Sequence, residues 1–239
     1  MWILNLLLVF VFIAGGYAGN QSWFTFDRLT KTNVLNSALI VLMLFTIMMV
    51  LYVLGFFPQS VAAPVMMVLY SLIGGFFTGY GFRLLGLRKE GRHLLYQHRS
   101  FWIDHAPNLL AVVIILYGIF RTAILTDQPV TGIRMTSGIS LICFGFFTWT
   151  LKVVPEFRSN GILLLDRFIP WDEVIAWSWQ GESVLEIEYM AQEAPKNERI
   201  RHFVTSIPED ERKEIEVILS SKMDEFSDER KLRLFKEEN

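Results

Sequence analysis

Long apolar stretches fill the first two thirds of the sequence and limit what it can fold into. The clearest one, 35–57, has 23 residues without a charge. A helix of about 20 apolar residues crosses the hydrocarbon core of a bilayer, and 52% of the chain is hydrophobic. We therefore expect an all-α membrane bundle of about five transmembrane helices. The expected helices lie at 2–18, 35–57, 61–82, 106–125 and 136–154, in a transmembrane domain over 1–155.

The first apolar stretch lacks the positive start that is typical of a secretory signal peptide. We expect it to be retained as a helix, with cleavage near Ala14-Gly15-Gly16 as the alternative.

Charge is divided unevenly along the chain. Up to Pro155 there are four acidic residues and ten Lys or Arg, whereas from Glu156 onward there are 20 acidic and 12 basic residues. Such a change indicates a domain boundary. Positive links stay on the cytoplasmic side of a membrane, so the basic link between the third and fourth stretches is expected there. The N-terminus then lies outside and the acidic C-terminal domain in the cytoplasm.

Small residues repeat along one face of the third stretch. Ser71, Gly75 and Gly79 are four residues apart, and Gly74 and Thr78 widen the same face. Small residues let helices approach closely where lipid provides no hydrophobic drive. We interpret Ser71, Gly75 and Gly79 as helix-packing residues, acting either within one bundle or between copies of a homo-oligomer.

The basic link is expected to lie on the membrane surface. Its headgroup-contacting residues are predicted to be Arg88, Lys89, Arg92 and Arg99. A short amphipathic helix from about Arg88 to Phe101 fits this role. Asp104 is expected to cap the fourth transmembrane helix, because a carboxylate accepts hydrogen bonds from the first turn.

Three of the four histidines, His93, His98 and His105, lie in or next to this link, beside Asp104. The His boxes of membrane desaturases and hydroxylases place metal ligands on adjacent helical turns, but these histidines are five and seven residues apart. The His-x4-Asp dyad of glycerolipid acyltransferases resembles His98 to Asp104, but here five residues intervene. We therefore predict no catalytic residue and no metal site. An active site at His98, Asp104 and His105 is kept as the alternative.

After Pro155 the apolar pattern changes from helical to alternating. Strands are expected at 156–158 and 162–165 around Ser159-Asn160-Gly161, because Asn-Gly is a strong hairpin signal. Further strands are expected at 174–179, 184–189 and 199–205.

The last predicted element is an amphipathic helix. Ser206-Ile207-Pro208-Glu209 matches a capping box that would open it. Its apolar residues fall on one stripe, namely Ile215, Ile218, Leu219, Met223 and Phe226. Residues 227–239 form a charged tail.

The hairpin, the segment Ile169-Pro170-Trp171-Asp172-Glu173-Val174 and the Ile-Pro-Glu start of the final helix together resemble a recurring module. The region 156–226 is similar to bacterial pleckstrin-homology-like (PH-like) domains that follow membrane helices in proteins of unknown function. This resemblance implies an α+β domain, with a PH-like antiparallel sheet or partial barrel and a C-terminal helix. It also implies a bacterial inner-membrane location and a binding role without catalytic residues.

The expected function is a non-enzymatic integral membrane protein, a scaffold or regulatory subunit that binds a partner through its PH-like domain. The alternative is a small membrane enzyme or transporter that acts on lipid through His93, His98, Asp104 and His105. Expected partners are membrane lipid and either a protein or a second copy of the chain. No cofactor is expected, and the acidic domain argues against nucleic acid.

Overall fold

The computed structural model describes residues 2–22, 25–26, 31–99, 101–152, 154–194 and 197–229. Most of the predicted charged tail, from 230 on, lies outside the described residues. The chain forms two compact units. The first comprises Met1–Gly86 and Phe101–Leu151, and the second comprises Leu87–Ser100 and Lys152–Asn239.

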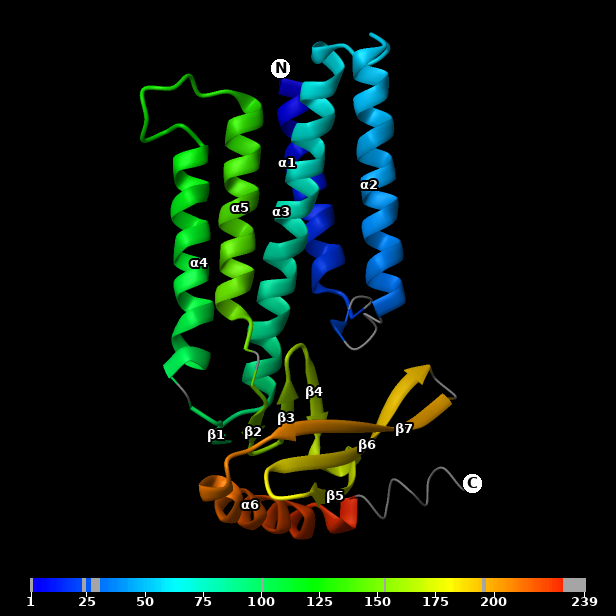
Figure 1. Ribbon diagram of the computed structural model, residues 1–239, viewed down its shortest axis with the longest axis vertical. Helices are drawn as coiled ribbons and strands as arrows, with labels where there is room; N and C mark the ends of the chain where they lie inside the picture. Colours follow the sequence, from blue (N-terminus) through cyan, green and yellow to red (C-terminus); the bar gives the residue numbers. More distant parts are fainter. Residues whose placement is uncertain are drawn as a thin grey trace. The chain divides into compact units, whose positions relative to one another are not determined.

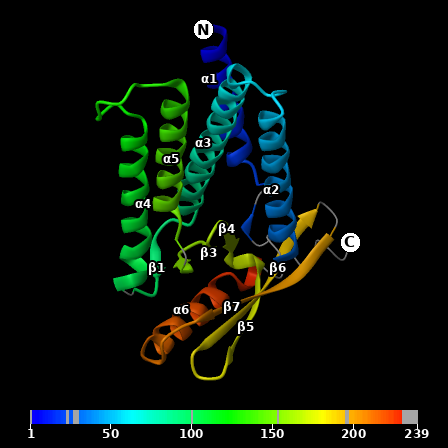
Figure 2. The ribbon, with the colours of Figure 1, turned by 45° about the horizontal axis from the view of Figure 1, so that its top comes forward.

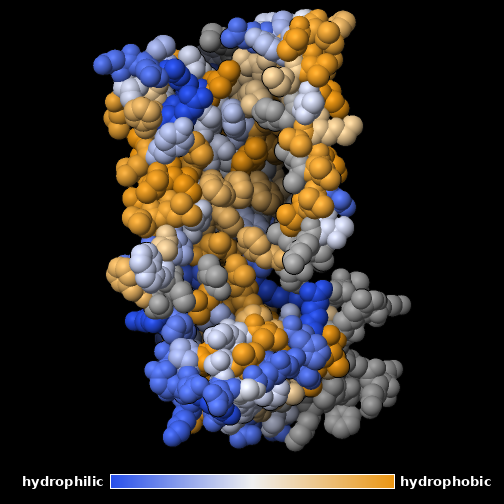
Figure 3. Space-filling model, in the orientation of Figure 1, coloured by the Kyte–Doolittle hydropathy of each residue, from blue (hydrophilic) through white to orange (hydrophobic). Residues whose placement is uncertain are grey.

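Five helices are described before residue 152 (Figure 1). They are α1 (Trp2–Asn20), α2 (Lys31–Val53), α3 (Gln59–Glu90), α4 (Phe101–Arg121) and α5 (Gly132–Thr150). α1, α3 and the Thr32–Val53 part of α2 are long and apolar enough to cross a membrane, and His105–Arg121 of α4 is a shorter apolar helix. Large hydrophobic side chains on these helices are exposed, and Figure 3 shows the hydrophobic surface that they form. The first unit is therefore a helical bundle with an apolar exterior.

The boundaries of the observed helices differ from the predicted ones by several residues. α2, α4 and α5 begin at Lys31, Phe101 and Gly132 instead of at 35, 106 and 136. A search for apolar runs misses polar first turns such as that of α5, whose N-cap is Thr131. α3 extends to Glu90 instead of 82, because a helix does not have to stop where charged residues begin.

Glycines bring α1 and α3 into direct backbone contact. A Cβ added to Gly75 would overlap the carbonyl oxygen of Phe12, and one added to Gly79 would overlap that of Gly16. A Cβ on Gly19 of α1 would overlap the carbonyl oxygen of Phe76 in the same way. Gly75 and Gly79, together with the buried Ser71, thus line a packing face within this chain, and α1 provides the matching glycines.

α4 and α5 pack through a similar contact. A Cβ on Gly118 would lie 2.9 Å from the carbonyl oxygen of Gly138, and a Cβ on Gly138 would lie 2.7 Å from that of Gly118. Any side chain at either position would push the two helices apart.

The second unit contains two antiparallel sheets and a C-terminal helix (Figures 1 and 2). In the four-stranded sheet the order is β1 (Leu94–Tyr96), β2 (Glu156–Arg158), β3 (Gly161–Leu164) and β4 (Arg167–Pro170). The three-stranded sheet contains β5 (Val174–Gln180), β6 (Val184–Ala194) and β7 (Asn197–Ser206). The 3-10 turn Trp171–Glu173 joins the sheets, and α6 (Arg212–Glu225) follows the second one.

One core joins the sheets to α6. Trp171 is fully buried in it, and its indole Nε1 donates to the carbonyl oxygen of Arg158 at 2.9 Å. Ile215 and Leu219 of α6 are fully buried, and Ile218, Met223 and Phe226 pack against the same core. The predicted apolar stripe and the sheet domain that ends in a helix are confirmed.

Several details of the predicted domain are corrected. The segment predicted as an interfacial helix from Arg88 to Phe101 contains the end of α3 and then β1, so 87–100 belongs to the second unit and not to a domain over 1–155. The break falls at Arg92, whose φ of 57° ends the helix. Strand β4 was not predicted. Ser206 is the last residue of β7, and α6 begins only at Arg212, after a 3-10 turn at Glu209–Glu211, so the predicted capping box does not open the helix.

Candidate functional site

The end of α3 is held by the side chain of Arg158, at the end of β2. Its Nη1 donates to the carbonyl oxygen of Arg88 at 3.0 Å and to that of Arg92 at 2.8 Å. The last carbonyl groups of a helix have no donors within the helix, and cationic side chains favour this negative end of the helix dipole. Arg158 therefore acts as a C-terminal cap for a helix that begins about a hundred residues earlier in the sequence.

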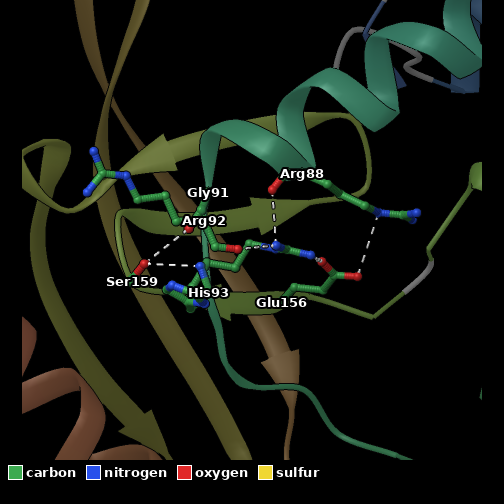
Figure 4. Close-up of polar contacts among 7 residues, drawn as sticks. Arg88, Gly91, Arg92, His93, Glu156 and Ser159 are labelled. Atoms are coloured by element: carbon green, nitrogen blue, oxygen red, sulfur yellow. Dashed lines mark hydrogen bonds and ion pairs between the residues drawn. The ribbon is translucent and has the colours of Figure 1, made fainter.

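The two residues after Arg158 extend this contact. Asn160 Nδ2 donates to the carbonyl oxygen of Glu90 at 3.2 Å, and Ser159 Oγ donates to that of Gly91 at 3.4 Å. The amide of Ser159 also donates to the carbonyl oxygen of His93 at 2.9 Å. Figure 4 shows Ser159 beside Gly91 and His93. We call residues 88–93 and 158–160 together the α3 cap.

A buried carboxylate fixes the guanidinium of Arg158. Glu156 is only 3% exposed, and its Oε2 accepts from Arg158 Nε at 2.8 Å and Nη2 at 2.6 Å. Arg88 Nε lies 3.9 Å from the other carboxylate oxygen of Glu156 (Figure 4). A buried charge is tolerated only with such partners, so Glu156 orients Arg158 toward the helix end.

The link between α3 and α4 also contains strand β1, which pairs with β2 of the first sheet. Leu94 is paired with Arg158 and Tyr96 with Phe157 across the sheet. The buried Tyr96 donates its hydroxyl hydrogen to Glu211 Oε2, and His98 Nδ1 lies 2.9 Å from the same oxygen. Glu211 directly precedes α6, so the link contacts both the first sheet and the start of the last helix.

The surroundings of Tyr96 and Glu211 set their protonation. Burial raises the pKa of the Tyr96 phenol, and the hydrogen bond to Glu211 with the charges of Glu211, Glu214 and Asp210 raises it further. Partial burial opposes ionisation of Glu211, but hydrogen bonds from Tyr96 and His98 and the charge of His98 outweigh it and lower its pKa. Near neutral pH the phenol therefore donates and the carboxylate accepts.

The predicted headgroup-contacting residues differ in their surroundings. Arg88 is directed at Glu156 within the second unit, whereas the side chains of Lys89, Arg92 and Arg99 are exposed. Contact of these three with lipid headgroups stays a prediction.

The predicted alternative active-site residues are divided between the units. His93 and His98 belong to the second unit and His105 to the first. His98 is paired with Glu211, while the His105 ring stacks on Phe101 at 4.6 Å between centroids. Asp104 was predicted to cap α4, but it is the fourth residue of that helix, which begins at Phe101, so it is not the N-cap residue; its side chain lies outside the described residues. Within the described part of the chain, no three His, Cys, Asp or Glu residues are grouped as metal ligands would be.

Sequence reasoning missed the residues that form the α3 cap. Ser159-Asn160-Gly161 was interpreted only as a hairpin turn, and Glu156 and Arg158 as strand residues. A short turn that offers two side-chain donors next to a strand arginine is compatible with capping a helix, but nothing in the sequence indicates which helix it reaches.

Comparison with protein families shows that residues 153–224 match a domain of unknown function (DUF5673). No curated protein and no solved structure matches the chain. The matched range contains β2 to β7 and most of α6 but not β1. The second unit thus contains the region that is similar to DUF5673, and strand β1, from the link that follows α3, lies outside that region.

Proposed function

We propose that this chain is a non-enzymatic multi-pass protein of the bacterial inner membrane, in which a PH-like domain binds a protein partner and is coupled to the membrane helices. The N-terminus lies outside and the domain lies in the cytoplasm. The protein acts as a scaffold or regulatory subunit.

The composition of the helices supports the membrane location. Three of them have the length and hydropathy of membrane spans, and their large exposed side chains are mostly aliphatic or aromatic. In water this surface would be an aggregation hazard, whereas lipid covers it at no cost. The basic residues that follow Gly86 favour the cytoplasmic side for the domain.

The strand arrangement supports a PH-like fold. The consecutive strands β2 to β4 form an antiparallel meander to which β1 adds from the link after α3, a second meander of β5 to β7 follows, and one C-terminal helix comes after it. The sequence resemblance lacked strands for a seven-stranded arrangement, and β1 and β4 supply them.

The α3 cap is the observation that carries the proposal. A domain that was only tethered to the membrane would need a flexible linker and no contacts between that linker and its core. Here the link after α3 contributes a strand, and its carbonyl groups accept hydrogen bonds from three successive residues of the domain. A partner that binds the domain can therefore alter the position of the end of α3, and a movement of α3 can alter the affinity of the domain for that partner.

The outer face of the second sheet is the proposed partner site. Ile200 and Val204 of β7 are 61% and 52% exposed, and the exposed His202 lies between them. Across the sheet, Val204 is opposite Glu186 and His202 is opposite Glu188. Among the described strands β7 pairs with β6 alone, so it offers an edge to which another strand can add.

The charges on this face indicate which kind of protein segment would bind there. His202 Nδ1 lies 3.0 Å from Glu186 and 3.5 Å from Glu188. Because His202 lies between Ile200 and Val204 on β7, the face combines two carboxylates with two exposed aliphatic side chains. A complementary occupant is an extended protein segment that alternates aliphatic residues with Lys or Arg.

Site-specific photo-crosslinking in native membranes tests this proposal. A photoreactive amino acid at Val204 should yield one discrete protein adduct, and the same group at Val217, an exposed position on α6, should not. Replacing both Glu186 and Glu188 by Gln should lower the yield at least several-fold, and the crosslinked peptide should contain Lys or Arg.

Equal crosslinking at both positions, or a yield that is insensitive to Glu186 and Glu188, would refute the proposed site. An adduct that consists only of a second copy of the chain would replace the partner by a homo-oligomer. The enzyme alternative requires instead that His98→Ala abolishes a lipid-modifying activity while the adduct still forms.

A further inference from the structure

An aromatic cavity of about 300 Å³ lies in the first unit. Phe76, Phe77 and Tyr80 of α3 and Phe144 and Phe147 of α5 form its walls, with Thr25 and Phe26 from the segment after α1. Ligand pockets begin at roughly this volume. Phe76, Phe77 and Phe144 are only half-buried, so the cavity is open on one side.

The rings of the walls support one another. Phe77 lies edge-to-face with Phe144 at 4.7 Å between centroids, and Tyr80 lies edge-to-face with Phe147 at 5.2 Å. The Phe76 ring stacks on Tyr80 at 5.9 Å. Aromatic side chains have few rotatable bonds, and paired rings hold their geometry. The cavity is therefore kept open by its own walls.

The lining selects an apolar occupant. Two hydroxyl groups, from Thr25 and Tyr80, are the polar side-chain groups among the lining residues. A buried water needs two to four polar partners, whereas a hydrocarbon chain gains dispersion contacts with every ring.

A cation lies at the Tyr80 side of this cavity. The guanidinium carbon of Arg83 is 5.6 Å from the centre of the Tyr80 ring, and its Nη1 donates to the carbonyl oxygen of Gln21 at 3.2 Å. A guanidinium carries five N–H donors in a planar fork that suits phosphate oxygens. Apolar walls with an arginine at one side match the two parts of an anionic phospholipid, in which no headgroup cation neutralises the charge of the phosphate.

We propose that this cavity binds one acyl chain of an anionic phospholipid, whose phosphate is bound by Arg83. The proposal rests on the membrane location given above but not on the partner site. Loss of lipid selectivity and loss of the protein adduct are therefore separate results.

Native mass spectrometry of the full-length protein in detergent tests it, with phosphatidylglycerol and phosphatidylcholine of identical chains as competing probes. The wild type should retain one phosphatidylglycerol with at least tenfold preference. Arg83→Gln should remove this preference and Arg83→Lys should keep most of it. Arg121→Gln, at the end of α4, is the matched control and should behave as the wild type.

A second pair of variants tests the cavity itself. Phe144→Trp fills space inside it and should abolish retention of both lipids, whereas Phe120→Trp, at an exposed position of α4, should not. The proposal is wrong if the two tryptophan variants retain lipid equally, or if Arg121→Gln lowers the selectivity as much as Arg83→Gln. Thermal unfolding of each variant verifies that the bundle is intact.

Discussion

Arg158 donates a hydrogen bond of 3.0 Å from its Nη1 to the carbonyl oxygen of Arg88, 70 residues earlier in the sequence. The acceptor belongs to the last turn of α3, and the donor is held by the buried Glu156. A single side chain thus links the end of an apolar helix to the first sheet of the C-terminal domain.

Removing this side chain should destabilise the domain strongly. Arg158→Gln leaves Glu156 buried without its main partner, and breaking a buried ion pair costs roughly 3–5 kcal/mol. Urea unfolding of the full-length protein, followed by tryptophan fluorescence, measures the change. Lys213→Gln, at an exposed position of α6, is the control and should stay within about 0.5 kcal/mol of the wild type. Equal effects of the two substitutions would argue against the α3 cap.

Acid should weaken the contact between β1 and the start of α6. The folded state lowers the pKa of Glu211 below its ordinary value of 4.5. Its stabilising contribution is therefore present above that pH and is lost as the pH falls through the lower folded value. The difference in unfolding free energy between wild type and Glu211→Gln should be largest near neutral pH and should shrink in acid.

Glu209→Gln serves as the control for this pH series, because Glu209 is exposed two residues earlier. It should change the stability little at any pH. A Glu211→Gln difference that stays constant down to pH 3 would show that the carboxylate does not contribute as described.

The contact between α1 and α3 should not tolerate a single methyl group. In Gly79→Ala the new Cβ meets the carbonyl oxygen of Gly16, and overpacking of this kind costs about 1–3 kcal/mol. Gly86→Ala lies in the same helix with nothing within 4 Å of the added Cβ. It should be neutral or stabilising by up to about 1 kcal/mol. Thermal denaturation in detergent distinguishes the two, and equal midpoints would contradict the close crossing.

Trp171 should be the most sensitive position of the domain core. It is fully buried, and its indole nitrogen donates to the carbonyl oxygen of Arg158. Trp171→Ala should cost about 3–5 kcal/mol, and Trp171→Phe less, because most of the buried area remains. Val217→Ala, at an exposed position of α6, should change little in the same urea titration.

Local patterns predicted much of the fold. The charge-free run at 35–57 indicated α2, the Asn160-Gly161 pair indicated the β2–β3 hairpin, and the spacing of Ile215 and Leu219 indicated the buried side of α6. Each of these signals depends on residues that are close in the sequence.

The candidate site could not be predicted in this way because its parts are distant in the sequence. Leu94-Leu95-Tyr96 is too short to distinguish a strand from the apolar face of an interfacial helix. Its pairing with β2 depends on residues that follow more than sixty positions later. For the same reason, Arg88 was predicted to contact lipid, although its Nε lies 3.9 Å from a carboxylate oxygen of Glu156.

Hydrogen exchange of the link between α3 and α4 tests most directly the claim that this link is part of the C-terminal domain. If residues 94–96 are a strand of the domain, their amides should exchange slowly in the full-length protein and should lose this protection in Trp171→Ala, together with β2 and β3. A membrane-surface helix would remain protected when the domain core is weakened. Protection of 94–96 that survives Trp171→Ala, while β2 and β3 exchange freely, would contradict the coupling of α3 to the domain.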